Sequence, residues 1–135
     1  MLKPTDIKFL VVHCSDTPDN NDIGAIEIHK MHIGFGWEGI GYHKIIRRNG
    51  FIENGRPEFW IGAHVYGINH LSLGVCLIGR NKFSDHQYLS LENILRRWKD
   101  KYPNAEIKGH CEVIETDKTC PNFNIRDFLE KRNLV

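Results

Sequence analysis

The sequence has no long hydrophobic run and almost no net charge. Its apolar stretches are far shorter than the roughly 20 residues that a membrane-spanning helix needs. Lys and Arg total 18 against 17 Asp and Glu, which gives a net charge of +1, so no general electrostatic attraction draws the chain to nucleic acid or anionic lipid. We therefore expect no nucleic-acid partner and no stable membrane association.

The start of the sequence does not have the pattern expected of a signal peptide, and cysteines are few. The segment Met1–Asp6 has no basic region followed by an apolar stretch and a small-residue cleavage site, which predicts synthesis in the cytoplasm. Four cysteines, Cys14, Cys76, Cys111 and Cys120, are too few for a disulfide scaffold. In a reducing compartment we expect them to be thiols or metal ligands.

What is present is the composition of an ordinary folded protein. Hydrophobic residues make up 41% of the 135 positions and charged residues 26%, and a chain of this length closes one hydrophobic core without disulfides or oligomerisation. No repeat, linker or low-complexity tract divides it. We expect a single domain, residues 1–135, that is a monomer.

The strand signals indicate a mixed sheet. Residues Ile7–Val12 and Leu73–Ile78 are nearly continuous apolar runs, typical of strands covered on both faces, and Glu106–Gly109 is a shorter strand. Between them, Lys44–Arg48 and Phe51–Glu53 flank the dipeptide Asn49-Gly50. This dipeptide favours a type I′ turn, in which both central residues have positive φ, and so predicts an antiparallel hairpin.

The helix signals alternate with these strands. Asp22 is a candidate cap for a helix that ends near Gly34 and rests on the sheet through Ile23, Ile26 and Ile33. A second helix starts at about Ser84, which forms a capping box with Gln87, and carries Tyr88, Leu91, Leu95 and Trp98 at helical spacing. A terminal helix with Ile125, Phe128 and Leu129 is capped by Asn122 or Asn124. The fold class is therefore α/β: a mixed β-sheet flanked by helices in a single domain.

Three residues from separate segments are candidate ligands of a catalytic zinc ion. His13 and His110 each follow a short strand, and loops at strand ends are where α/β sheets usually build their sites. Cys120 precedes Pro121 near a helix start, so its thiol can be held in place with a lowered pKa. Catalytic zinc typically takes three protein ligands of these types and keeps a fourth position open for water.

Two further residues are placed to act beside such a metal. Lys118 stands two residues before Cys120, and in an extended loop such residues project to the same side. Tyr42 stands at the mouth of the predicted hairpin, where its phenol can point toward a bound water. Neither position follows from spacing alone.

These residues lie in motifs that resemble the amidase-2 family of N-acetylmuramoyl-L-alanine amidases, especially the small lysozyme-named amidases of T-odd bacteriophages. The resemblance covers almost the whole chain and includes Val11-Val12-His13-Cys14-Ser15, Gly36-Trp37, Gly41-Tyr42-His43, Gly62-Ala63-His64, Asn69-His70, Gly74-Val75-Cys76-Leu77, His110 and Lys118-Thr119-Cys120-Pro121. It implies a fold like that of peptidoglycan-recognition proteins, zinc held by His13, His110 and Cys120, and Tyr42 with Lys118 as the catalytic pair.

The resemblance also implies a substrate groove lined by His64, Asn69 and His70. One departure from the commonest family pattern is Asn122, which stands where many relatives have glycine. Asn tolerates left-handed backbone conformations, so the change is compatible with the same loop. The length of the loop between His110 and Cys120 also varies within the family, which leaves the direction of Lys118 open.

The remaining cysteines and histidines have structural interpretations. Cys14, Cys76 and Cys111 are expected to pack as small hydrophobic residues, with Cys14 and Cys111 pointing away from the metal that their histidine neighbours face. His29, His32 and His86 lie in helical patterns and indicate surface or packing positions, although His32 can also face the groove.

The resemblance implies hydrolysis of the amide between N-acetylmuramic acid and L-alanine in peptidoglycan. In the expected role, an endolysin made in the host cytoplasm reaches the wall after the membrane is permeabilised. The alternatives are a cytoplasmic amidase that recycles soluble muropeptides and a non-catalytic peptidoglycan-binding module, against which Cys120 argues. Some phage relatives also bind an RNA polymerase, but the six residues before the first strand offer no support for such a partner here.

Overall fold

A computed structural model describes residues 1–134 of the chain and contains a five-stranded mixed sheet. In spatial order the strands are β3 (Ile52–Asn54), β2 (Lys44–Ile46), β4 (Ser72–Leu77), β1 (Phe9–Cys14) and β5 (Glu106–Gly109). The β2–β3 pair is antiparallel, and the pairs β2–β4, β4–β1 and β1–β5 are parallel. The predicted α/β class with a mixed sheet is confirmed.

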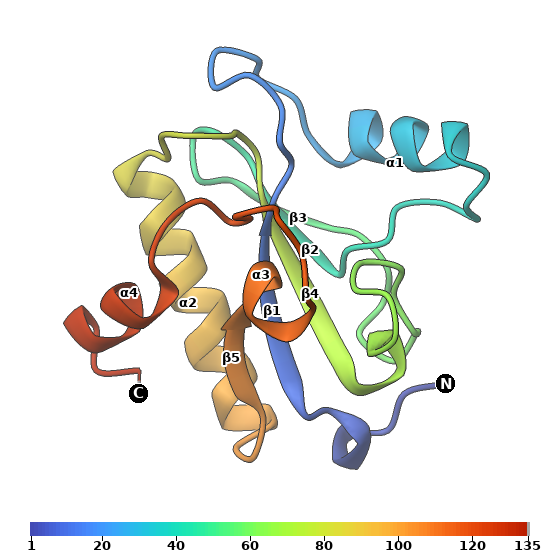
Figure 1. Ribbon diagram of the computed structural model, residues 1–135, viewed down its shortest axis with the longest axis vertical. Coiled ribbons are helices and arrows are strands. Elements are labelled where there is room, and N and C mark those ends of the chain that lie inside the picture. The colour runs from blue at the N-terminus through green and yellow to red at the C-terminus, as the bar shows by residue number, and fades with distance from the viewer. Residues whose placement is uncertain (135) are drawn as a thin grey trace.

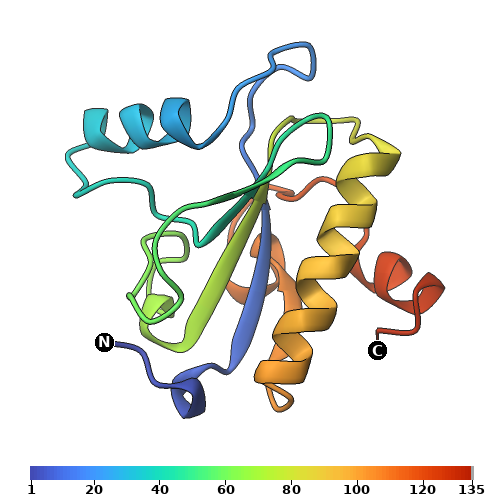
Figure 2. The same ribbon diagram turned by 180° about the vertical axis from the view of Figure 1, so that it is seen from behind.

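Helices cover both faces of this sheet. The helical elements are η1 (Pro4–Asp6), α1 (Ala25–Gly34), η2 (Asn69–Leu71), α2 (Asp85–Lys101), α3 (His110–Val113) and α4 (Ile125–Lys131). Figure 1 shows α3 in front of β1, and Figure 2 shows α2 running along the opposite face with α4 beside it. Within residues 1–134, no helix combines the length and apolar character needed to cross a membrane.

The sheet has one purely structural face and one face available for chemistry. Leu10 and Val12 of β1 belong to the main core together with Leu91, Leu95 and Trp98 of α2. Successive side chains of a strand point to opposite faces, so His13 points away from α2. The same alternation in β4 places Leu73, Val75 and Leu77 in the core and leaves Gly74 and Cys76 on the His13 face.

The predicted caps of two helices are confirmed. Ser84 Oγ accepts the Gln87 backbone N–H at 3.1 Å while Gln87 Oε1 accepts the Ser84 backbone N–H at 3.0 Å. Asn124, one of two candidate residues, caps α4 by accepting the Asp127 backbone N–H at 3.0 Å. These bonds satisfy donors that the first turn of a helix leaves without partners.

The prediction for α1 is wrong in its cap and in its buried face. The N-cap is Gly24 rather than Asp22, and the buried residues are Ile28 and His32, whereas Ile26 and Ile33 are 66% and 48% exposed. The reason is its position: α1 stands beyond the end of the sheet and does not rest on it (Figure 1). Its buried residue Ile28 packs in a small cluster with Ile40, Ile45 and Ile78.

The hairpin is confirmed, but its turn type is not. Gly50 has φ +89°, whereas Asn49 is not among the residues with positive φ, as a type I′ turn would require. The backbone N–H of Gly50 bonds to the carbonyl of Arg47 at 2.8 Å, and the N–H of Arg47 bonds to the carbonyl of Phe51 at 2.9 Å. The loop is therefore three residues long, with glycine alone in the left-handed position.

Candidate metal centre

The two candidate histidine ligands meet because β1 and β5 are parallel neighbours. Val12 pairs with Gly109 in the sheet register, so His13 and His110 emerge next to each other at the same edge. Their ring centroids are 4.6 Å apart. The pairing of β1 with β5 thus places two histidines that are 97 positions apart in sequence beside each other.

Cys120 is held beside these histidines by main-chain hydrogen bonds. Its carbonyl accepts the Cys111 N–H at 3.0 Å, and its Sγ accepts the Cys14 N–H at 3.1 Å. The ligand atoms of His13, His110 and Cys120 all lie within 4.8 Å of one another, the single such cluster of metal-binding side chains found in residues 1–134. Zinc ligands at about 2.1–2.3 Å from the ion stand roughly 3.5 Å apart in a tetrahedral site, so these three fit zinc after a small closure.

The protonation states of the two imidazoles suit a metal ligand. Burial is the main cause that lowers the pKa of His13, with neighbouring histidines adding to it, and the pKa of His110 is lowered by burial and by the charge of Lys118. Both side chains are therefore neutral near pH 7. A neutral imidazole has a lone pair for a metal ion, whereas a protonated one has none.

The thiol chemistry differs from the sequence-based expectation in two ways. Cys14 was expected to point away from the metal, but its Sγ contacts Cys120, and it also borders the cavity described below. Contact with Cys14 and burial raise the pKa of the Cys120 thiol, where a lowered pKa was expected. A coordinated metal ion deprotonates a thiol outright, so the thiolate at Cys120 depends on the ion rather than on the fold.

A cavity of about 550 Å³ lies over this cluster and contains both members of the predicted catalytic pair. The Tyr42 ring centroid is 5.1 Å from that of His13, and burial raises the pKa of its phenol well above the ordinary value. Lys118 is an exposed side chain at the rim. The cavity is lined by His13, Cys14, Ser15, Asp16, Ile28, Met31, His32, Phe35, Trp37, Tyr42, Ala63, His64, Arg80, Asn81, His110, Lys118, Thr119, Cys120 and Asn122.

The three predicted substrate contacts occupy different positions. His64 lines the cavity and is in hydrogen-bond contact with His13. The side chain of Asn69 binds the backbone: its Oδ1 accepts the N–H groups of His64 and Val65 at 2.9 and 2.8 Å. His70 is exposed on η2, and among the described residues neither it nor Asn69 borders this cavity.

Two aromatic residues that were not predicted as part of the site, Phe35 and Trp37, also line the cavity. Phe35 and Trp37 are 65% and 42% exposed, and their ring centroids are 5.5 Å apart at the edge of the cavity. Trp37 packs edge-on against His32 at 4.5 Å. The sequence signal for this pair was the alternation of aromatic residues with Gly34 and Gly36.

Asn122 has the backbone conformation that its place in the motif suggested. Its φ is +69°, the left-handed region in which Asn replaces Gly at small cost. Its side chain also donates to the carbonyl of Arg80 at 2.6 Å and contacts Cys14 Sγ at 3.7 Å. Asn122 therefore ties the loop carrying Lys118 and Cys120 to the segment after β4.

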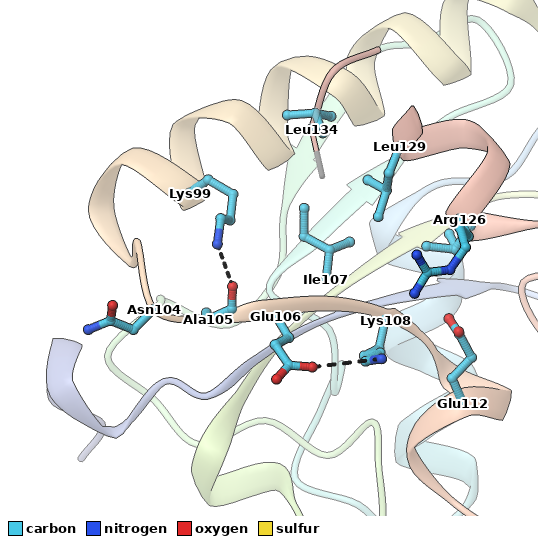
Figure 3. A pocket seen from close by; sticks show the side chains of 11 residues that line it. Lys99, Asn104, Ala105, Glu106, Ile107, Lys108, Glu112, Arg126, Leu129 and Leu134 are labelled. Atoms are coloured by element: carbon cyan, nitrogen blue, oxygen red, sulfur yellow. Dashed lines mark hydrogen bonds and ion pairs between the residues drawn. The ribbon is translucent and has the colours of Figure 1, made fainter. Parts of the chain in front are cut away.

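A second cavity, of about 280 Å³, lies at the outer edge of β5 (Figure 3). Its floor is aliphatic, formed by Ile107, Leu129 and Leu134, and Lys99 at its rim donates to the carbonyl of Ala105 at 2.6 Å. Lys108 and Glu106 pair with each other at 3.7 Å. The metal-binding cluster lies in the other cavity, so the candidate site is assigned there.

Comparisons with known proteins identify the family of the chain. The sequence profile of the N-acetylmuramoyl-L-alanine amidase family matches residues 3–123. The endolysin of Escherichia phage T7 is 40% identical over 134 residues, covering 93% of this chain and 87% of that protein. The solved N-acetylmuramoyl-L-alanine amidase LysC from Clostridium intestinale URNW has a TM-score of 0.85 at 30% identity, covering 100% of this chain and 91% of that one.

A more distant structure shows how general the scaffold is. Bumblebee PGRP-SA superposes with a TM-score of 0.77 at 23% identity, covering 90% of this chain and 80% of that one, and shares the fold alone. The predicted fold family and the predicted enzyme activity are both confirmed. The chain therefore belongs to the amidase-2 family of N-acetylmuramoyl-L-alanine amidases and is a peptidoglycan amidase of the phage endolysin type.

Proposed function

We propose that the chain is a zinc-dependent endolysin that cleaves the amide between N-acetylmuramic acid and L-alanine. The observation that carries this proposal is the cluster of His13, His110 and Cys120 at the floor of a cavity that also contains Tyr42 and Lys118. Two neutral imidazoles and one thiolate form the donor set of a catalytic zinc site with an open position. Bound zinc would supply polarisation of the amide carbonyl and would acidify a water molecule.

The side chains of this protein supply the remaining chemistry. The ammonium of Lys118 stabilises the negative charge that develops on the carbonyl oxygen as the amide is attacked. The hydroxyl of Tyr42, 5.1 Å from His13 between ring centroids, orients the attacking water or relays its proton. No nucleophilic side chain is needed, and peptidoglycan binds along the cavity.

The relatives support the proposed biological role. Phage proteins named endolysin are about as long as this chain, and the phage T3 protein is 38% identical over 134 residues. We place the enzyme in the host cytoplasm during synthesis and at the cell wall after the membrane has been permeabilised. A recycling amidase would instead act on soluble muropeptides.

Substrate assays with product masses test the activity. Purified protein is incubated with intact sacculi and, separately, with soluble anhydromuropeptides, with and without a zinc chelator. We expect release of stem peptides that begin with L-alanine from sacculi, about one zinc per chain, and loss of activity with chelator. Activity that persists in a chelator on protein without zinc contradicts the metal assignment. Cleavage of soluble fragments with intact sacculi left untouched replaces the lysis role with recycling.

Delivery to the wall is tested in cells. We expect bacteria that express the protein to tolerate it until chloroform or a co-expressed holin opens the membrane, and then to lyse rapidly. The matched control is Lys118→Ala, which should bind the same wall without lysing the cells. Permeabilised cells that stay intact with active enzyme inside contradict the endolysin role.

A further inference from the structure

The candidate metal ligand His13 is in side-chain contact with a second buried histidine, His64. His13 Nε2 and His64 Nδ1 are 2.9 Å apart, and the two rings meet edge-on with an interplanar angle of 84°. His13 is 1% exposed and His64 is 9% exposed. The contact is therefore shielded from the solvent that would otherwise satisfy these nitrogen atoms.

Two glycines make room for the His64 ring. A Cβ at Gly74 would lie 2.6 Å from His64 Nδ1, and a Cβ at Gly62 would lie 2.7 Å from His64 Cδ2. Contacts this short would displace the ring, so no other residue type fits at either position with the ring in place. The main chain at His64 is also held, because its N–H donates to Asn69 Oδ1 at 2.9 Å.

The hydrogen bonds around His64 indicate which of its two ring nitrogens carries the proton. The Ser72 hydroxyl donates its single proton to the carbonyl of Ile68 at 2.8 Å. Ser72 Oγ also faces His64 Nε2 at 3.4 Å, and with its proton committed it can only accept there. His64 therefore carries its proton on Nε2 and has its lone pair on Nδ1.

This tautomer determines the tautomer of the metal ligand. Since His64 Nδ1 is an acceptor, His13 Nε2 must be the protonated nitrogen that donates to it across the 2.9 Å contact. The lone pair of His13 is then on Nδ1, the one nitrogen left for a metal ion. Metal-ligating histidines generally donate their second N–H to a partner that fixes the ring orientation and raises the basicity of the ligand.

We propose that His64 is a positioning residue that holds His13 in the tautomer and orientation needed to bind zinc through Nδ1, rather than primarily a contact for the substrate. The proposal rests on the proposed zinc-dependent function. Asn69 then has an indirect role, because its side chain holds the backbone of His64 in place.

Two substitutions distinguish the hydrogen-bonding role of His64 from the space that its ring fills. His64→Phe keeps a ring of similar size but removes the acceptor, whereas His64→Asn retains an acceptor oxygen near the position of Nδ1. We expect zinc affinity, measured by competition with a chromophoric chelator, to fall about 10- to 100-fold in His64→Phe and to recover largely in His64→Asn. His86→Phe, on the exposed face of α2, is the control with unchanged affinity, and thermal melts verify that each variant is folded.

Nitrogen NMR of the metal-free wild-type protein tests the tautomers directly and needs no variant. We expect His13 and His64 each to be protonated on Nε2. His13 protonated on Nδ1, or wild-type zinc affinity in His64→Phe, overturns the proposal. At saturating zinc the two roles of His64 predict different kinetics. If His64 contacts the substrate, His64→Phe has a higher KM than wild type. If His64 positions His13, kcat/KM of His64→Phe returns to the wild-type value. A wild-type protein that binds no zinc refutes the proposed function, while the NMR experiment still reports on the His13–His64 bond.

Discussion

The Nδ1 atom of His32 accepts a hydrogen bond from the main-chain N–H of Gly41 at 2.9 Å, one residue before Tyr42. His29, one helical turn earlier on α1, accepts the N–H of Ile40 in the same way at 3.1 Å. Two histidines of α1 thus hold the loop that carries a proposed catalytic residue. This arrangement gives α1 a function in the site although it does not rest on the sheet.

Removal of the His32 contact should impair catalysis and stability together. In His32→Ala the buried N–H of Gly41 has no partner, which costs about 1–3 kcal/mol of the free energy of unfolding, and Tyr42 loses its fixed position. We expect a lower melting temperature and a lower kcat with normal zinc content. The control is His86→Ala on α2. Unchanged kcat in His32→Ala would show that Tyr42 is positioned without α1.

Stability of the metal-free protein should decrease on mild acidification. Burial lowers the pKa values of His13, His32, His43, His64 and His110 below the ordinary value of 6.5. The unfolded chain therefore binds more protons than the folded one below about pH 6.5. This contribution to stability is fully present above pH 6.5 and is lost as the pH falls through the folded-state pKa values. Thermal melts in chelator between pH 8 and pH 5 measure it, and a constant melting temperature over that range would contradict it.

The cysteines should separate into a metal ligand and a core residue. Cys120→Ser replaces a thiolate by a hydroxyl, a much weaker zinc ligand, so we expect loss of bound zinc and of nearly all activity. Cys76 is fully buried, and Cys76→Ser should reduce the free energy of unfolding by about 1–3 kcal/mol with zinc retained. Metal analysis and denaturant titration of both variants check this; equal zinc loss in the two would refute the division.

The catalytic pair should affect turnover without affecting the metal. Lys118→Ala removes a charge that acts where negative charge develops, which typically costs about 100-fold or more in kcat, and Tyr42→Phe removes a hydroxyl that contributes a comparable factor in proton transfer. We expect zinc content and melting temperature close to wild type for Lys118→Ala. Lys82→Ala, another exposed lysine, is the matched control. Normal kcat in both catalytic variants would leave the metal site alone responsible for the reaction.

Elements that depend on neighbouring residues could be predicted from the sequence. Continuous apolar runs predicted β1 and β4, the Ser84 and Gln87 pair predicted the start of α2, and Asn49-Gly50 predicted the hairpin. These signals are readable because capping, turn formation and strand burial involve neighbouring residues. The motifs that resemble the amidase-2 family likewise identified the family and its activity.

Features that depend on residues far apart in the sequence could not be predicted and are visible in the three-dimensional structure. The cap and buried face of α1 were mispredicted because the helix does not pack on the sheet. Its contacts include hydrogen bonds from the backbone N–H groups of Ile40 and Gly41 to two of its histidines. Cys14 lies against Cys120 because strand β1 and a loop 106 residues later converge. The His13–His64 contact needs the space left by Gly62 and Gly74. Sequence periodicity does not predict such a contact, because close packing between separate segments depends on their fit in three dimensions.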